Sequence, residues 1–205
     1  MRENVSQTLQ QYIEDNILPY YNGFDKAHQQ EHVRMVISQS LELASHLNVN
    51  HDMVYAIAAY HDTGLCKGRE HHHEISAKII REDKNLRQWF TEEQISVMAD
   101  AAEDHRASSN HEPRTIYGRI VAEADRCIDP ITIIQRTIAY GLDNYPEMNR
   151  EEHYRRMKIH LNEKYGRQGY LKLWFEDSAN AQKLEELRVI IEDEAKLRQL
   201  FDLWI

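Results

Sequence analysis

Apolar residues recur every three to four positions along most of the chain. The first set is Val5, Leu9, Ile13 and Ile17, and a second clear set runs through residues 33–47. This spacing is typical of amphipathic helices, and no alternating strand pattern of comparable length accompanies it. The pattern therefore predicts an all-α protein of about eight to ten helices.

Capping residues and breakers mark where these helices begin and end. Pro19 and Gly23 are expected to break the first helix. Three later starts share an N-cap residue followed by a capping-box partner or a proline: Thr91 with Gln94, Asp129 with Pro130, and Asn149 with Glu152. The chain has 7 Gly and 4 Pro and no low-complexity linker, which indicates a compact array of helices.

The C-terminal region carries its own helical pattern. From Ser178 the sequence predicts one long charged amphipathic helix, with Leu184, Leu187 and Ile191 near one face. We expect this helix to pack on the main bundle rather than to form an oligomer contact, and the sequence leaves the oligomeric state open. With 205 residues, of which 41% are hydrophobic, the chain can bury the core of one domain.

Charge and composition limit the classes of molecule that the protein is expected to bind. The formal net charge of -9 and the isoelectric point near 5.7 argue against binding long nucleic acid, which needs a basic surface. No apolar run approaches the roughly 20 residues of a membrane span, and no signal-peptide pattern opens the chain. Only Cys66 and Cys127 are present, which gives no disulfide framework. We therefore expect a cytoplasmic protein with free thiols and no membrane or long nucleic-acid partner.

Histidines are concentrated in one part of the sequence. Ten of the twelve lie between His28 and His111, and the pair His61 and Asp62 directly follows the apolar segment 54–60. Imidazole and carboxylate together favour Mn, Co, Ni, Fe or Zn over Mg or Ca. Neighbouring residues in a helix point about 100° apart. At a helix end that is closed by Gly64, however, both side chains could converge on one ion.

The histidines and aspartates come in a characteristic order. These residues are His32, His61 with Asp62, His72 before Ser76, His105, and Asp125. The order resembles that of the HD-domain superfamily of metal-dependent phosphohydrolases over about residues 25–130. This resemblance implies an HD-domain-like helical bundle with the site between its helices. We expect a single domain, residues 1–205, with the metal-site core at about 25–130 and a helical extension at 131–205.

The resemblance also implies a ligand set. His32, His61, Asp62 and Asp125 would hold one divalent transition metal. His72 and His105 match the additional histidines of two-metal members, in which Asp62 would bridge a second ion. Within the run of residues 71–73 the register is ambiguous: spacing to Ser76 favours His72, with His73 in reserve. The alternative is a one-metal site whose extra histidines only support it.

Other residues near this set suggest how a substrate would be held. A subgroup of the superfamily has a histidine four residues before the first ligand, which here is His28; it would carry a proton or contact phosphate, or else cap a helix or support the site. Basic side chains near the ligands could bind phosphate, although a solvated surface is the simpler alternative. With His73, the substrate-binding candidates are Lys67, Arg69, Arg106 and Arg126. His46, His51, His111, His153 and His160 lack the spacing, so surface or capping roles are expected.

The leading hypothesis is hydrolysis of a phosphoester or phosphoanhydride in a small phosphorylated metabolite, most simply a nucleotide. Metal-activated water would attack phosphorus, with Asp62 orienting or deprotonating the water and His28 as a second catalytic candidate. Two alternatives are a di-iron HD-type oxygenase and a non-catalytic metal-containing domain that senses a ligand.

Overall fold

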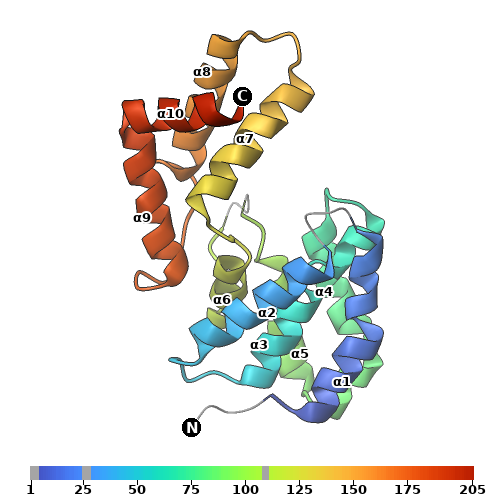
Figure 1. Ribbon diagram of the computed structural model, residues 1–205. Helices are drawn as coiled ribbons and strands as arrows, with labels where there is room; N and C mark the ends of the chain where they lie inside the picture. The colour runs from blue at the N-terminus through green and yellow to red at the C-terminus, as the bar shows by residue number, and fades with distance from the viewer. Residues whose placement is uncertain (1–4, 25–28, 108–110) are drawn as a thin grey trace. The chain divides into compact units, whose positions relative to one another are not determined.

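The computed structural model describes residues 5–24, 29–107 and 111–205. In this part of the chain every regular element is helical, with ten α-helices, three 3₁₀ helices and no strand (Figure 1). The all-α prediction is confirmed. The chain divides into two compact units, Met1–Arg126 and Cys127–Ile205. Whether the second unit is an extension of one domain, as expected from the sequence, stays a prediction.

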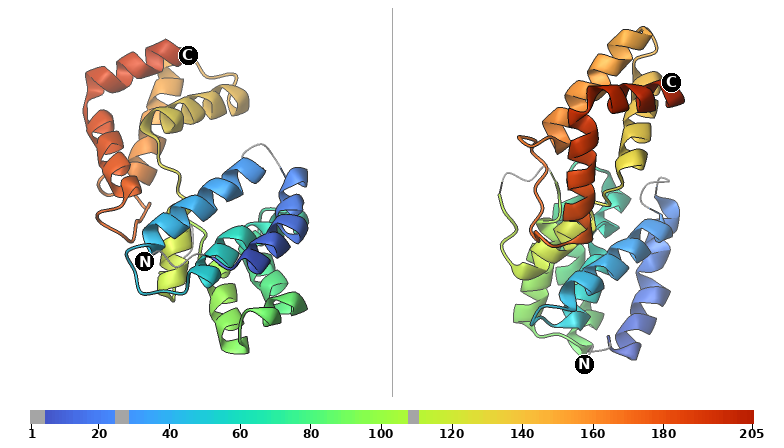
Figure 2. Two further views of the ribbon diagram at one scale, coloured as in Figure 1. Left: turned by 60° about the horizontal axis from the view of Figure 1, so that its bottom comes forward. Right: turned by 60° about the vertical axis from the view of Figure 1, so that its left-hand side comes forward.

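Six α-helices and three short 3₁₀ helices make up the described part of the first unit. In chain order they are α1 (Gln7–Asn16), η1 (Leu18–Gly23), α2 (Gln30–Ala44), α3 (His51–Tyr60), η3 (Thr63–Lys67), α4 (His72–Glu82), η4 (Lys84–Gln88), α5 (Glu92–Glu103) and α6 (Ile116–Ala124). Helix α3 lies in the middle, because α2, α5 and α6 all pack against it (Figures 1 and 2). All its residues from Met53 to Tyr60 are buried, as expected for a helix that is apolar all round.

The helix starts expected from the sequence are confirmed. Thr91 and Asn149 each form a complete capping box, and the Asp129 side chain accepts from the Thr132 N–H at the start of the helix that opens with Pro130. The first helix ends at Asn16, before the 3₁₀ helix that contains Pro19. Each cap satisfies backbone N–H groups that have no partner within their own helix.

The second unit consists of α7 (Pro130–Asn144), α8 (Arg150–Tyr165), α9 (Ala179–Glu192) and α10 (Glu194–Trp204). The prediction of one long helix from Ser178 is wrong, because Asp193 separates α9 from α10. Asp193 has an extended backbone, and its side chain accepts from the Lys196 N–H as the N-cap of α10. The turn lets α10 pack Phe201 against Tyr154, with ring centroids 5.2 Å apart.

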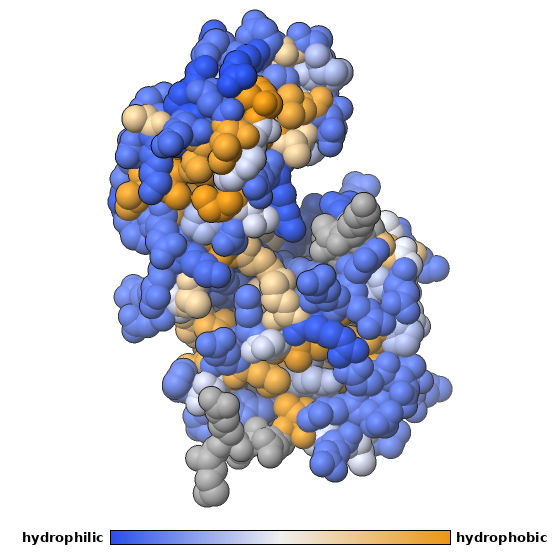
Figure 3. Space-filling view, in the orientation of Figure 1, coloured by the Kyte–Doolittle hydropathy of each residue, from blue (hydrophilic) through white to orange (hydrophobic). Residues whose placement is uncertain are grey.

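Each unit has its own apolar core. Leu9, Ile57 and Met98 belong to the core of the first unit, and Met157 and Leu187 to that of the second. In the view of Figure 3 the first unit is mostly hydrophilic at its surface, whereas apolar side chains gather on the visible face of the second. None of the helices in the described part of the chain is long and apolar enough to cross a membrane. Neither Cys66 nor Cys127 forms a disulfide.

Candidate metal centre

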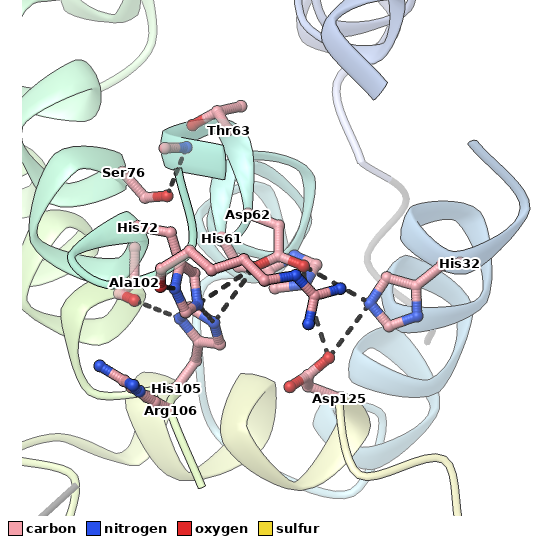
Figure 4. A network of polar contacts seen from close by, with 12 residues as sticks. His32, His61, Asp62, Thr63, His72, Ser76, Ala102, His105, Arg106 and Asp125 are labelled. Atoms are coloured by element: carbon pink, nitrogen blue, oxygen red, sulfur yellow. Dashed lines mark hydrogen bonds and ion pairs between the residues drawn. The ribbon is translucent and has the colours of Figure 1, made fainter. Parts of the chain in front are cut away.

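The six ligand candidates come from five different parts of the first unit. His32 lies in the first turn of α2, His61 and Asp62 follow α3, His72 opens α4, His105 follows α5, and Asp125 caps α6. All six side chains point into one cluster between these helices (Figure 4). Residues separated by up to 93 positions in the chain (from 32 to 125) therefore meet at one place.

The end of α3 directs its two ligands to the same place. His61 still has helical backbone angles, with φ -51° and ψ -36°, whereas Asp62 has φ -110° and ψ 5°. Asp62 thus leaves the helix in the sparsely populated bridge region, where many active-site residues lie. A regular helix would point the two side chains about 100° apart. The change of backbone conformation at Asp62 brings them together.

One group of side chains gathers around a single oxygen of each carboxylate. The His32 Nε2 lies 3.2 Å from Asp125 Oδ1 and 3.8 Å from Asp62 Oδ2. The His61 Nε2 lies 3.4 Å from Asp62 Oδ2 and 3.6 Å from Asp125 Oδ1. We call His32, His61, Asp62 and Asp125 the first ligand set.

A second group uses the other oxygen of Asp62. The Nε2 atoms of His72 and His105 lie 3.5 Å and 3.4 Å from Asp62 Oδ1, and 3.3 Å from each other. We call Asp62, His72 and His105 the second ligand set. In Figure 4, His32 and Asp125 lie on one side of Asp62, and His72 and His105 on the other. Within each of two groups the ligand atoms lie within 4.8 Å of one another, so that each group could hold a metal ion. One group is His32, His61 and Asp62, and the other is the second ligand set.

Backbone carbonyl groups fix the orientation of three of the imidazoles. A carbonyl oxygen can only accept, so each Nδ1 must carry a proton, and Nε2 is the nitrogen that can bind a metal once the ring is neutral. In each case the acceptor lies three residues earlier: His61 to Ala58 at 2.7 Å, His72 to Arg69 at 2.7 Å, and His105 to Ala102 at 2.5 Å. This arrangement is typical of histidines that bind metals.

The geometry passes a simple test for a metal. Among the described residues, the Nε2 of His61 is buried and forms no hydrogen bond, although the carboxylate oxygens of Asp62 and Asp125 lie 3.4 Å and 3.6 Å from it. A buried polar atom without a partner costs free energy unless something satisfies it. A cation between this nitrogen and the carboxylates of Asp62 and Asp125 would do so, and imidazole with carboxylate is a suitable donor set for a transition metal.

Burial and neighbouring charges shift the pKa values of several ligand candidates. Burial lowers the pKa of His61, but the negative charges of Asp62 and Asp125 outweigh it and raise the pKa to about 10. Burial works to raise the pKa of both carboxyl groups, but the neighbouring histidines hold it well below the usual range. The pKa of His72 is lowered, first by burial and then by the electrostatic effect of the neighbouring His105 ring. Without a metal, the first set is thus held by an imidazolium between two carboxylates.

We expect metal binding to release a proton from His61. A metal needs the neutral imidazole, whereas a pKa of about 10 keeps the metal-free ring protonated at neutral pH. The apparent affinity for Mn²⁺ should rise about tenfold per pH unit between about pH 7 and 9. Calorimetry in buffers of different ionisation enthalpy should show about one proton released per ion at the first set.

The exposed His46 provides the control for this prediction. His46→Gln should leave both the pH dependence and the proton count unchanged, since this side chain is remote from the ligands. An affinity for Mn²⁺ that does not change across this pH range would contradict the protonated state of His61.

Helix α4 packs closely against η3, the short helix that follows the end of α3. The Gly64 N–H donates to Ser76 Oγ at 2.9 Å. A Cβ on Gly64 would lie 2.0 Å from the carbonyl oxygen of His72 and 2.7 Å from the Ser76 nitrogen. Glycine is therefore required here because α4 must come this close to present His72. The sequence pattern of a histidine four residues before Ser76 has a structural reason, since both residues belong to this contact.

The basic residues fall into two groups. Arg126 is almost completely buried, with its side chain 7% exposed, and its Nη1 donates to the His105 carbonyl at 3.0 Å and lies 3.7 Å from Asp125 Oδ2. It therefore links the two ligand sets. Arg106 is partly exposed and donates to the Glu70 carbonyl at 2.8 Å. Lys67 and Arg69 are exposed, close in sequence to His72.

The structure distinguishes the three consecutive histidines. His72 is the one whose Nε2 lies beside Asp62 and His105. The Nε2 of His73 lies 3.8 Å from Glu74, and the pKa of His73 is lowered by burial and by the charge of Arg106. His71 is exposed between two glutamates. His28 lies outside the described residues.

Several supporting residues carry no signal in the sequence. Asp104 is buried next to His105 and accepts from the backbone N–H and the guanidinium of Arg114, which secures the segment after α5. The Tyr21 hydroxyl contacts the backbone of Ala59 and of Asp62. His153, expected at the surface or as a cap, is instead buried in the second unit at 5% exposure, because it faces inward on α8.

A comparison with protein families agrees with this geometry. Residues 30–128 match the family model of the HD domain. No curated protein and no solved structure gave a significant match. The matched region contains all six ligand candidates, whereas Tyr21 and nearly all of the second unit lie outside it. Residues 30–128 therefore belong to the HD-domain superfamily.

Proposed function

We propose that this protein hydrolyses a phosphoester or phosphoanhydride bond in a small phosphorylated metabolite, with a nucleotide as the expected class. The observation that carries the proposal is the carboxylate of Asp62, which offers one oxygen to each of two histidine-containing ligand sets. Such a bridging carboxylate is typical of two-metal hydrolytic sites. The proposed substrate is small, and we expect neither long nucleic acid nor a membrane as a partner, in a cytoplasmic setting.

The donor atoms indicate the kind of metal. The first set offers two imidazole nitrogens and two carboxylates, and the second offers two imidazoles and the shared carboxylate. This mixture suits Mn, Co, Ni, Fe or Zn. We propose one ion at the first set, which has more ligands, and a second ion at the second set. A divalent transition ion supplies a hydroxide nucleophile near neutral pH, because it lowers the pKa of bound water from 15.7 towards about 7.

The chain's own residues supply positioning and charge. Asp62 lies between the two sets, where it can orient the attacking water or accept its proton. Arg106 is the best-placed basic residue for a substrate phosphate, since it is partly exposed, adjoins His105 and lies close enough to His73 to lower the pKa of that ring. Lys67 and Arg69 remain proposed phosphate contacts, and His28 a proposed proton carrier. Arg126 is better suited to hold the ligands, because its guanidinium already contacts His105.

The direct test is a screen in which each metal is examined separately. Protein loaded with Mn, Co, Ni, Mg or Fe is incubated with nucleoside mono-, di- and triphosphates, cyclic nucleotides and dinucleoside polyphosphates. We expect hydrolysis with at least one transition metal, and its loss in His61→Ala. Undiminished hydrolysis in that variant would overturn the proposal. Oxygen uptake by the iron-loaded protein would indicate a di-iron oxygenase instead, and tight metal binding without any turnover would indicate a sensing domain.

We expect His72→Ala to remove one of two ions. His72 belongs only to the second set, so the four side chains of the first set remain intact. Metal content should fall from about two ions to about one, and hydrolysis by roughly a hundredfold. Metal analysis by mass spectrometry and steady-state kinetics measure the two effects.

His73→Ala is the matched control, since His73 is adjacent in sequence but does not face Asp62. It should keep the full metal content. The opposite result, with metal lost in His73→Ala and kept in His72→Ala, would show that the second ion lies elsewhere.

A further inference from the structure

The last carbonyl groups of α3 all receive hydrogen bonds from side chains. The Ala58 carbonyl accepts from His61 Nδ1 at 2.7 Å, and the Tyr60 carbonyl accepts from Thr63 Oγ1 at 2.8 Å. The carbonyl between them, that of Ala59, accepts from the hydroxyl of Tyr21 at 2.9 Å. Carbonyls at a helix end have no partner within the helix, so each needs one from elsewhere. Here Tyr21 provides the one that is distant in sequence.

The same hydroxyl also accepts a hydrogen bond from the first residue beyond the turn. The Asp62 N–H donates to Tyr21 Oη at 3.3 Å. In a continuing helix this N–H would bond to the Ala58 carbonyl, which here accepts from the His61 ring. Tyr21 therefore connects the helical side of the turn to the residue that leaves the helix. The two hydrogen bonds of Tyr21 thus enclose the turn that determines where the His61 and Asp62 side chains point.

The surroundings of Tyr21 shield this contact from water. Its side chain is fully buried, and its ring packs 5.3 Å from that of Phe24 and 6.5 Å from the imidazole of His61. A buried hydrogen bond is stronger than one in water, and leaving its partners unsatisfied is costly. Tyr21 belongs to η1, so it comes from a segment that precedes the HD-domain match at residues 30–128.

We propose that Tyr21 is a positioning residue for the metal centre. Its hydroxyl holds the α3 turn in the conformation that points His61 and Asp62 at the same ion. Without the hydroxyl, the Asp62 amide and the Ala59 carbonyl would lose a buried partner, and the turn could relax towards a regular helix that separates the two ligands. This inference rests on the proposed metal centre and concerns ligand geometry rather than the hydrolytic step.

The test is Tyr21→Phe in the full chain, which keeps the ring and removes only the hydroxyl. We expect the affinity for Mn²⁺ to fall roughly tenfold, as is usual when a group that orients a ligand is removed. The visible absorption spectrum of the Co²⁺-loaded protein, which reports ligand geometry, should also change. The matched control is Tyr55→Phe, because Tyr55 is a buried tyrosine of α3 whose hydroxyl interacts electrostatically with Glu14 and Arg34. It should leave both readouts unchanged, whatever it does to thermal stability.

Each possible result of these measurements supports or overturns the role of Tyr21. Wild-type Mn²⁺ affinity and Co²⁺ spectrum in Tyr21→Phe would overturn the role of Tyr21 and leave the metal centre standing. Equal changes in both variants would also overturn it, because the effect would then be one of general stability. Failure of the wild-type chain to bind Mn²⁺ or Co²⁺ would overturn the metal centre and the role of Tyr21 together. If Tyr21→Phe does not fold, amide exchange of Asp62 in the wild type should be slow, and fast exchange would contradict the proposal.

Discussion

Replacing Asp62 with asparagine should remove metal from both ligand sets and lower hydrolysis by at least about a thousandfold. Asp62 is the only ligand candidate shared by the two sets, with Oδ2 facing His61 and Oδ1 facing His105. Asparagine keeps the size of the side chain but has no charge and only one oxygen. Each set would thus lose a carboxylate oxygen or its negative charge. Metal content and turnover of the purified variant provide the two measurements.

The comparison for this variant is Asp83→Asn. Asp83 accepts hydrogen bonds from the hydroxyls of Tyr12 and Tyr60 in the same unit, but takes no part in the ligand cluster. It tests whether loss of any hydrogen-bonded carboxylate has the same effect. We expect this control to keep its metal and activity even if it unfolds at a lower temperature. Equal, tight metal content in Asp62→Asn and in the wild type would refute the assignment of the centre.

Among the glycines of the first unit, Gly64 is the one at which a change to alanine should lower stability most. The new Cβ would meet the backbone of His72 and Ser76 at 2.0 Å and 2.7 Å, and backbone atoms cannot rotate away as a side chain can. Relief requires α4 to move. We expect a loss of about 2–3 kcal/mol, which corresponds to a melting temperature lower by about 5–10 °C. Since His72 opens α4, the ion at the second set should be lost as well.

Gly23→Ala separates this steric effect from the general cost of replacing glycine. A Cβ at Gly23 would meet nothing within 4 Å, so this variant should melt within about 2 °C of the wild type and keep its metal. Thermal unfolding followed by circular dichroism, together with metal analysis, tests both variants. A Gly64→Ala protein with wild-type stability and metal content would mean that α4 does not approach the turn this closely.

Local features of the chain were predictable because they depend on neighbouring residues. The capping boxes at Thr91 and Asn149 and the start at Asp129 follow from hydrogen bonds that span three residues. The apolar segment before His61 predicted a buried helix with a polar pair at its end. Ligand order was also readable, because each histidine or aspartate of the family pattern keeps its place along the chain.

Where a local signal has two uses, the sequence was less informative. Asp193 could be a solvated residue within a charged helix or the N-cap of a new one, and the packing of Phe201 against Tyr154 favours the second use. His153 has the polar character of a surface residue, yet it faces inward on α8. Local pattern does not reveal which face of a helix another helix will cover.

By itself, the sequence determined the all-helical class, the main helix starts and the family pattern of His32, His61, Asp62 and Asp125, because these are short-range or ordered features. Only the tertiary structure decided that His72 rather than His73 faces Asp62, that Asp62 divides its two oxygens between two ligand sets, and that Arg126 holds ligands together. It alone brought Tyr21 to the end of α3. These relations depend on the distance and direction between atoms far apart in the chain, which the packing of helices sets and residue order does not encode locally.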